Sequence, residues 1–234
     1  MARLCVICAL LSGVLSAASP GTYLLRDDFE KSAAGGKPAG WVAMSDEGNE
    51  IAVVAQPAIG TRAVRLSHTS GTVWKPYLSG VFGGGSDTMT AVDFDVYFTG
   101  RFTADAKSFF FIMRGPVDTP YIRIALGGPS GAAPEGRDGF FPLNVPIRTN
   151  TWYHISVRID ALSKGESGTY TLIISDATRV MPFENIPLCI PKSYAPSKKI
   201  FPAKAEGSPG FTLPEAPGKD VYIDNVSIQV IDKK

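Results

Sequence analysis

Asp93 and Asp95 are the residues of this chain best spaced to act together in catalysis. They stand two apart in the alternating stretch "AVDFDVYF", and residues i and i+2 of a β-strand project from the same face. A glycoside hydrolase needs two carboxyl groups about 5 to 10 Å apart across the scissile bond. No glutamate follows to complete such a cluster, so the simpler interpretation is the solvent face of a strand.

Nucleophilic chemistry has fewer candidates still. Gly-x-Ser-x-Gly does not occur, and Cys189 lies in the apolar, proline-flanked stretch "IPLCIP", which favours an idle thiol. His68 and His154 have no motif around them. The sequence therefore favours a non-catalytic protein.

Polar and aromatic residues recur on the outward side of the middle strands. Alternation with apolar neighbours predicts outward side chains at Asp95, Tyr97, Tyr121, Arg123, His154 and Arg158. If these strands are neighbours in one sheet, they form a platform suited to sugars, whose hydroxyls bind charged groups and whose C–H faces pack on rings. Cross-strand Asp–Arg pairing would explain the same charges without a ligand. Trp74 and Tyr77, in "TVWKPYLSG", are further candidate sugar contacts.

The first eighteen residues predict a secretory signal peptide. Arg3 precedes an apolar run that is too short to span a bilayer, and Ser16-Ala17-Ala18 supplies small residues for cleavage. We expect a secreted, periplasmic or cell-surface protein that begins near Ser19 and has no membrane span in its mature part. Without Arg3 the net charge falls from +1 to about zero, which argues against nucleic acid as a partner. Only Cys189 would remain, so no intrachain disulfide is expected.

The mature chain, residues 19–234, reads as one all-β domain. Short alternating segments are separated by turn residues such as "GGPSG" and "SKGESG", and the 24 glycines and 18 prolines leave little room for helices. This pattern predicts a two-sheet antiparallel sandwich or jelly roll. Two stretches, 127–150 and the proline-rich 182–220, are expected to be long loops, the second either a lid or a simple surface insertion.

The stretch "VYIDNVSIQV", residues 221–230, raises a separate question. Strict alternation places Tyr222, Val226, Ile228 and Val230 on one face of a strand together with Asp224. A lone carboxylate on an apolar face is costly unless it is paired, hydrogen-bonded or bound to a metal. We therefore expect a structural role for Asp224.

Several motifs carry a resemblance to a known family. The opening "LLRDDFE", the middle stretches "AVDFDVYF" and "NTWYHISVRID", and the closing "YIDNVSI" resemble the concanavalin A-like and laminin-G-like jelly rolls of secreted bacterial proteins. They are also similar to β-sandwich carbohydrate-binding modules. The resemblance implies that the first and last strands lie side by side.

The resemblance further implies a structural calcium ion at these paired terminal strands. The matching positions are Asp28 or Glu30 near the start and Asp224 near the end. Calcium prefers several oxygen ligands, including carboxylates. The alternatives for Asp224 are hydrogen bonds from backbone N–H groups or a pair with Arg26.

Three functions remain open at this point. The first is a non-catalytic module that binds a glycan or a cell-surface polymer. The second is a structural or adhesive envelope protein that contacts another protein. The third is a polysaccharide lyase or glycoside hydrolase that uses Arg123, His154 and Tyr97 on an acidic sugar.

Overall fold

The computed structural model describes residues 22–45, 49–55, 61–68, 76–83, 89–99, 109–115, 120–127, 131–160, 162–188, 190, 207–213 and 219–231. The expected signal peptide 1–18, Trp74 and Cys189 lie outside these residues.

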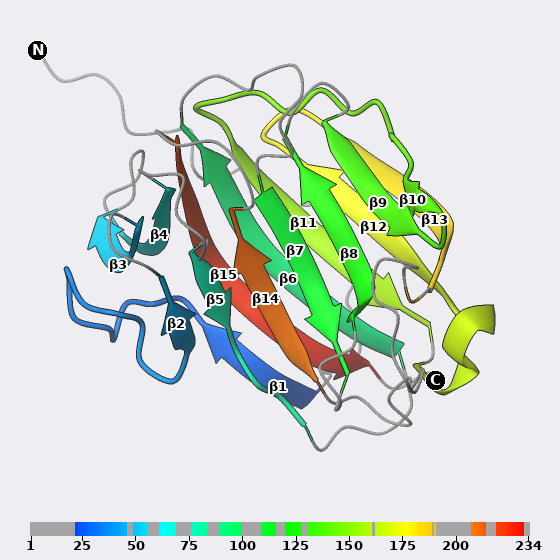
Figure 1. Cartoon of the computed structure of the whole chain (residues 1–234), viewed down its shortest axis with the longest axis horizontal. Helices are drawn as coiled ribbons and strands as arrows, with labels where there is room; N and C mark the ends of the chain where they lie inside the picture. The colour runs from blue at the N-terminus through cyan, green and yellow to red at the C-terminus, as the bar shows by residue number, and fades with distance from the viewer. Residues whose placement is uncertain are drawn as a thin grey trace, which may run out of the picture.

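Two antiparallel β-sheets stack face to face, as the sequence predicts (Figure 1). The eight-stranded sheet has the order β13-β12-β11-β6-β15-β4-β3, with β1 also paired to β15, and the seven-stranded sheet has the order β10-β9-β8-β7-β14-β5-β2. The strands of the eight-stranded sheet are β1 (Thr22–Asp27), β3 (Asn49–Ala55), β4 (Arg62–His68), β6 (Met89–Phe98), β11 (Trp152–Ile159), β12 (Thr169–Ser175), β13 (Val180–Pro187) and β15 (Lys219–Ile231). The strands of the seven-stranded sheet are β2 (Val42–Met44), β5 (Tyr77–Ser79), β7 (Phe109–Arg114), β8 (Pro120–Leu126), β9 (Ala132–Gly136), β10 (Gly139–Phe140) and β14 (Ser208–Thr212).

The helical content of the described residues is one short 3-10 segment, η1 (Leu162–Ser167). Across these same residues, no helix has the length and apolar character needed to cross a membrane. The all-β sandwich predicted from the alternating segments is confirmed.

The core lies between the two sheets and is built from the inward residues of alternating strands. Val92, Phe94, Val96 and Phe98 of β6 and Tyr153, Ile155, Val157 and Ile159 of β11 are all buried there. The ring of Phe94 lies 4.9 Å from that of Phe111 and 5.1 Å from that of Phe211, so the aromatic residues of both sheets interlock. Burying a phenylalanine side chain contributes about 1.5–3 kcal/mol, which makes this cluster a principal stabiliser of the sandwich.

Strand β15 changes its partner half-way along one edge. Its first half, Lys219–Ile223, pairs with β4, and its second half, Val226–Val230, pairs with β1. Its other edge pairs with β6. The prediction that the first and last strands lie side by side is confirmed, and Asp224 and Asn225 fall at the point where one neighbour gives way to the other.

The two stretches expected to be long loops both contain strands. Residues 127–150 include β9 and β10, and residues 182–220 include the end of β13 and all of β14. The sequence interpretation gave too much weight to proline. Strand β13 is an edge strand, where a proline that lacks an N–H donor costs little, and Phe211 of β14 contributes a buried ring that secures a central strand.

Candidate functional site

A β-bulge interrupts β15 at Asn225. Asp224 lies opposite Asp95 of β6 and Ser227 lies opposite Asp93, so β15 uses one residue more than β6 over the same length. Asn225 has a φ of 50°, in the left-handed region that asparagine tolerates better than most residues. The bulge lies where β15 exchanges β4 for β1.

The predicted direction of Asp224 is wrong because of this bulge. Strict alternation put this carboxylate on the apolar face together with Val226 and Ile228. Because of the extra residue, Ile223 before the bulge and Val226 after it both point into the core, and Asp224 points to the outer face beside Asp95. Asp224 is nevertheless only 4% exposed.

Asp95 lies at the centre of a row of polar contacts on this outer face. Its Oδ1 contacts Nδ1 of His154 at 2.7 Å, and its Oδ2 accepts a hydrogen bond from Nδ2 of Asn225 at 2.8 Å. Asp93 Oδ1 lies 3.7 Å from Nε2 of His154. Asn225 also donates to Asp224, from its backbone N–H at 2.7 Å and from Nδ2 at 3.3 Å. We call these five residues the acid–histidine ladder.

The ladder shifts two pKa values. Hydrogen bonds to Asp93 and Asp95 raise the pKa of His154 to about 9, against the effect of burial, so the imidazole is charged at neutral pH. Burial raises the pKa of Asp224 to about 7; the backbone N–H of Asn225 opposes this rise, and the charges of Asp95, Glu30 and Asp28 add to it. The ladder therefore sets two carboxylates, Asp93 and Asp95, against one cation, with Asp224 on the other side of Asp95.

A pocket of about 210 Å³ lies beside the ladder, over the β1–β15 pair, and its lining residues are Tyr23, Arg26, Asp27, Asp28, Asn225, Val226 and Ser227. We call it the β1–β15 pocket. Tyr23 is 51% exposed, and the guanidinium carbon of Arg26 lies 5.3 Å from the centre of its ring. Asn225 belongs to both the pocket and the ladder, so the two share one side chain.

Both carboxylates of the pocket already accept hydrogen bonds within the fold. Asp27 accepts hydrogen bonds from the backbone N–H of Phe29 at 2.7 Å and from Nε1 of Trp41 at 2.8 Å. Asp28 accepts one from the backbone N–H of Glu30 through Oδ1, at 3.2 Å. No carboxylate of the described residues forms an ion pair with Arg26, so its donors remain available for a ligand.

Three aromatic residues lie next to the ladder on the same face. The ring of Tyr97 is 5.2 Å from that of Trp152 and 5.9 Å from that of Tyr222. The Tyr97 hydroxyl donates to Oδ1 of Asn150 at 3.3 Å. Tyr97 is buried between its neighbours, so it supports this face and offers little surface to a ligand.

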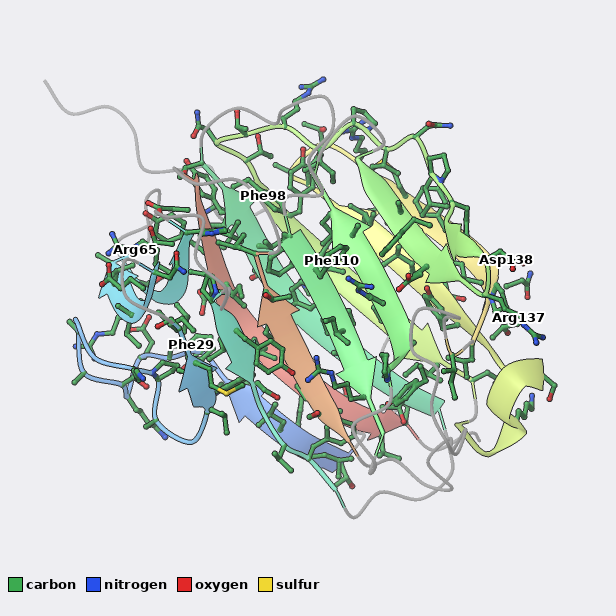
Figure 2. The ribbon with its side chains drawn as sticks, viewed as in Figure 1. Phe29, Arg65, Phe98, Phe110, Arg137 and Asp138 are labelled. Atoms are coloured by element: carbon green, nitrogen blue, oxygen red, sulfur yellow. The ribbon has the colours of Figure 1, made fainter. Side chains whose placement is uncertain are left out.

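The outer face of the seven-stranded sheet has a different character. Arg123 lies 4.1 Å from the ring centre of Phe110 and 5.3 Å from that of Phe140, and it forms a 3.1 Å ion pair with Glu135. Phe110, which Figure 2 labels in the middle of this sheet, is buried although it points away from the main core. Arg123 therefore covers an apolar cluster.

A second arginine on this face is held in a similar way. Arg114 lies 4.8 Å from the ring centre of Tyr77 and donates to its hydroxyl at 2.7 Å. The Tyr77 ring rests on Gly210, where an added Cβ would come within 2.6 Å of the Tyr77 hydroxyl oxygen. Glycine at this position leaves room for the ring, which occupies the space of a side chain.

The predicted platform is thus divided between two sheets. Asp95, Tyr97, His154 and Arg158 belong to the eight-stranded sheet, and Tyr77, Tyr121 and Arg123 belong to the seven-stranded sheet. Arg158 points outward as predicted, with Nε 3.4 Å from Oγ of Ser156. Strands β6 and β11 are neighbours, but β5 and β8 belong to the other sheet, so the predicted residues do not form one continuous platform.

The predicted outward direction of Tyr121 is wrong. Tyr121 is only 1% exposed and belongs to the main core, and burial raises the pKa of its phenol. The pairing of β7 with β8 shifts register between Met113 and Arg114, which disturbs the alternation beside Tyr121. Ile122, predicted to face inward, is buried as well.

Sequence reasoning missed Tyr23, Asn225 and Ser227 as site residues. The signal that could have found them is the carboxylate of Asp224 on an otherwise apolar face, because such a conflict in alternation also indicates a bulge. Asparagine, which tolerates a positive φ, follows directly at the position of the bulge.

The expected calcium ligands lie near one another but already make other contacts. Asp28 accepts from Glu30, Glu30 Oε1 accepts from the backbone N–H of Arg62 at 2.6 Å, and Asp224 accepts from Asn225. Among the residues that the structure describes, no group of three or more His, Cys, Asp or Glu side chains is arranged to hold a metal ion. Calcium stays a prediction of the family resemblance.

The fold and the site define an antiparallel β-sandwich of the jelly-roll class, with a polar pocket on one outer face. The resemblance to concanavalin A-like and carbohydrate-binding sandwiches is therefore confirmed at the level of the fold. No protein-family profile and no curated protein sequence matches the chain.

Solved structures of the same fold align with most of the chain. A conserved carbohydrate esterase from the Shiga toxin-encoding bacteriophage phi24B is 16% identical, with a TM-score of 0.60, over 91% of this chain and 100% of that chain. The cellulose induced protein Cip1 is 14% identical, with a TM-score of 0.53, over 87% of this chain and 96% of that chain. The binding domain of botulinum neurotoxin DC, in complex with SialylT, is 9% identical, with a TM-score of 0.52, over 91% of this chain and 48% of that chain. At these identities the likeness concerns the fold alone.

Proposed function

We propose that this protein is a non-catalytic β-sandwich module that binds a glycan in the β1–β15 pocket. The observation that carries the proposal is the combination, in one 210 Å³ depression, of an exposed tyrosine ring with hydrogen-bonding groups of both polarities. Solved carbohydrate-active and ligand-binding proteins of the same fold support a sugar as the ligand.

The pocket groups match what a sugar presents. The ring of Tyr23 offers an apolar surface for the C–H face of a pyranose. Arg26 supplies N–H donors, and Asp28 supplies a carboxylate acceptor. Arg26 is stacked on Tyr23, which limits its rotamers before a ligand arrives.

A glycan array probed with residues 19–234 tests the proposal. We expect binding to at least one glycan, and Tyr23→Ala combined with Arg26→Ala should weaken that binding at least tenfold, because both the ring and the donors are lost. Arg158→Ala is the matched control, since it removes a cation from the same sheet outside the pocket. The control should bind as the wild type does.

Other results would favour the alternative functions. Equal weakening by Arg158→Ala would place the ligand elsewhere on this face. Absence of binding to every glycan on the array would contradict glycan binding and favour an adhesive protein whose partner is another protein. Oligosaccharide release from uronate polymers, measured by a reducing-end assay, would identify an enzyme.

We further propose that the protein acts outside the cytoplasm, after removal of residues 1–18. The apolar run and the small residues before Ser19 support this placement. N-terminal sequencing of the protein recovered from its native host should begin near Ser19. A start at Met1 would contradict export by cleavage.

A further inference from the structure

We infer that the β1–β15 pocket takes a single neutral sugar residue and rejects uronic acids. This inference rests on the proposed function and adds the class of sugar to it. It follows from which charged groups are already committed around the pocket and which remain available.

The cations near the pocket are committed, with one exception. His154 lies between Asp95, at 2.7 Å, and Asp93, at 3.7 Å. Arg62 donates to the backbone carbonyls of Glu30 and Ser32. Arg26 is the cation in the lining of the pocket.

Carboxylates outnumber that single cation. Asp27 and Asp28 both line the pocket beside Arg26. Asp27 accepts one N–H donor on each oxygen and adds a negative charge to the pocket. Glu30 continues the same turn, and Asp224 and Asp95 lie behind Asn225.

Apart from burial, the raised pKa of Asp224 reflects this excess of negative charge. After burial, the charges of Asp95, Glu30 and Asp28 raise its pKa, which means that they oppose a further negative charge close to Asn225. A uronate carboxylate in the adjoining pocket would meet the same carboxylates, with Asp27 in addition. Repulsion at separations of 4–6 Å reaches the scale of a tenfold change in affinity even near a protein surface.

Neutral hydroxyls fit the same groups well. A sugar hydroxyl both donates and accepts, so a vicinal pair can accept from Arg26 and donate to Asp28, with the hydroxyl of Ser227 as a third partner. Pockets for drug-sized ligands have volumes of about 300–1,000 Å³, and this one, at about 210 Å³, is smaller. It therefore has room for one sugar ring, a chain end or a side branch.

The structure does not bring together the three residues, Arg123, His154 and Tyr97, on which binding of an acidic sugar was predicted to depend. Arg123 belongs to the opposite sheet and is paired with Glu135. His154 is held by two aspartates, and Tyr97 is buried. The three therefore do not converge on one ligand.

Sugars that differ only at C6 test the inference. We would measure binding of residues 19–234 to oligomers of glucose and glucuronate, galactose and galacturonate, and mannose and mannuronate, by calorimetry at low salt. We expect at least one neutral oligomer to bind and its acidic partner to bind at least tenfold more weakly. Equal or tighter binding of the acidic partner would overturn the inference and leave glycan binding intact. Absence of binding to all six would overturn the inference, and the glycan array would then decide separately whether the proposed function stands.

A charge variant identifies the source of the discrimination. Asp28→Asn removes one negative charge from the pocket, so it should improve the relative affinity for the acidic oligomer severalfold. Glu184→Gln is the matched control, because it removes the same charge from exposed β13 at the far edge of the same sheet. An identical response of the two variants would show that net charge alone sets the preference and would contradict the role of Asp28.

Discussion

The two outer faces of this sandwich use charged residues in opposite ways. On the seven-stranded sheet, Arg123 lies against two phenylalanine rings and pairs with a buried glutamate. On the eight-stranded sheet, His154 is half exposed, and an open pocket adjoins its partner Asp95 through Asn225. The first face uses charge to seal an apolar cluster, and the second keeps polar groups accessible to solvent.

This difference teaches where to look for a ligand. A stabilising face loses its purpose if its side chains must move for a ligand, because the cluster beneath them would be exposed. A binding face carries polar groups that are held in place but not covered, often at a cost in stability. The elevated pKa of Asp224 is such a cost, and it falls on the face with the pocket.

The largest effect is expected from Arg123→Ala. This change leaves the Glu135 carboxylate, only 6% exposed, without its ion-pair partner and uncovers Phe110. We expect a loss of about 3 kcal/mol in the free energy of unfolding, measured by urea denaturation. Arg158→Ala, on the other face, should change it by less than about 0.5 kcal/mol. Similar losses for both variants would break the distinction between the faces.

Asp224→Asn should raise the free energy of unfolding, whereas Arg123→Ala lowers it, and the gain should depend on pH. The carboxyl has a folded-state pKa of about 7, above its ordinary value of 3.8, so the native state binds more protons between these values. Wild-type stability should therefore fall as pH rises from about 4 to 7, and remain lowered above 7. Asparagine has no charge to bury.

We expect Asp224→Asn to gain about 2 kcal/mol at pH 8 and almost nothing at pH 4, by urea denaturation at both values. A variant less stable than the wild type at pH 8 would show that the carboxylate is stabilising, as a bound cation would make it. His154 changes in the same direction at higher pH. Its raised pKa of about 9 means that its contribution is complete below about 6.5 and is lost as pH rises through 9.

Gly210→Ala should have an intermediate effect confined to the seven-stranded face. The new methyl group would stand 2.6 Å from the Tyr77 hydroxyl oxygen and 2.9 Å from its Cε2, so the ring must move. We expect a loss of about 1–2 kcal/mol and no change in glycan binding. In a Tyr77→Ala background the same substitution should cost much less, and an undiminished cost there would refute the contact.

Calcium is expected to have the smallest effect. If the ion implied by the family resemblance binds Asp28, Glu30 and Asp224, it stabilises the folded state through linkage, and EDTA should lower the melting temperature. The shift should be smaller than those above, because the three carboxylates already accept hydrogen bonds. A melting temperature that changes with neither EDTA nor added calcium would contradict calcium binding.

Much of the fold could be predicted because it depends on local alternation. The buried positions of β6 and β11 follow period two without interruption, so Asp93, Asp95, His154 and Arg158 were assigned the correct direction. The pairing of the terminal strands was implied by the family resemblance and not by alternation.

The site was harder to predict because register shifts and sheet membership decide it. One extra residue at Asn225 reverses the alternation, and a shift beside Arg114 accompanies the burial of Tyr121. Period-two analysis cannot tell which of two stacked sheets receives a strand, so Arg123 was grouped with residues of the opposite face. The β1–β15 pocket depends on a pairing of residues about 200 positions apart, which no local pattern contains.

The position of β15 has a consequence for biosynthesis. This strand separates β6 from β4 and β1, so the eight-stranded sheet stays in three pieces, β13-β12-β11-β6, β4-β3 and β1, until residues 219–231 have been translated. Contacts between such distant segments form slowly, because a long loop must close before the contacts can stabilise the chain. The eight-stranded sheet can therefore close only after β15 has been synthesised.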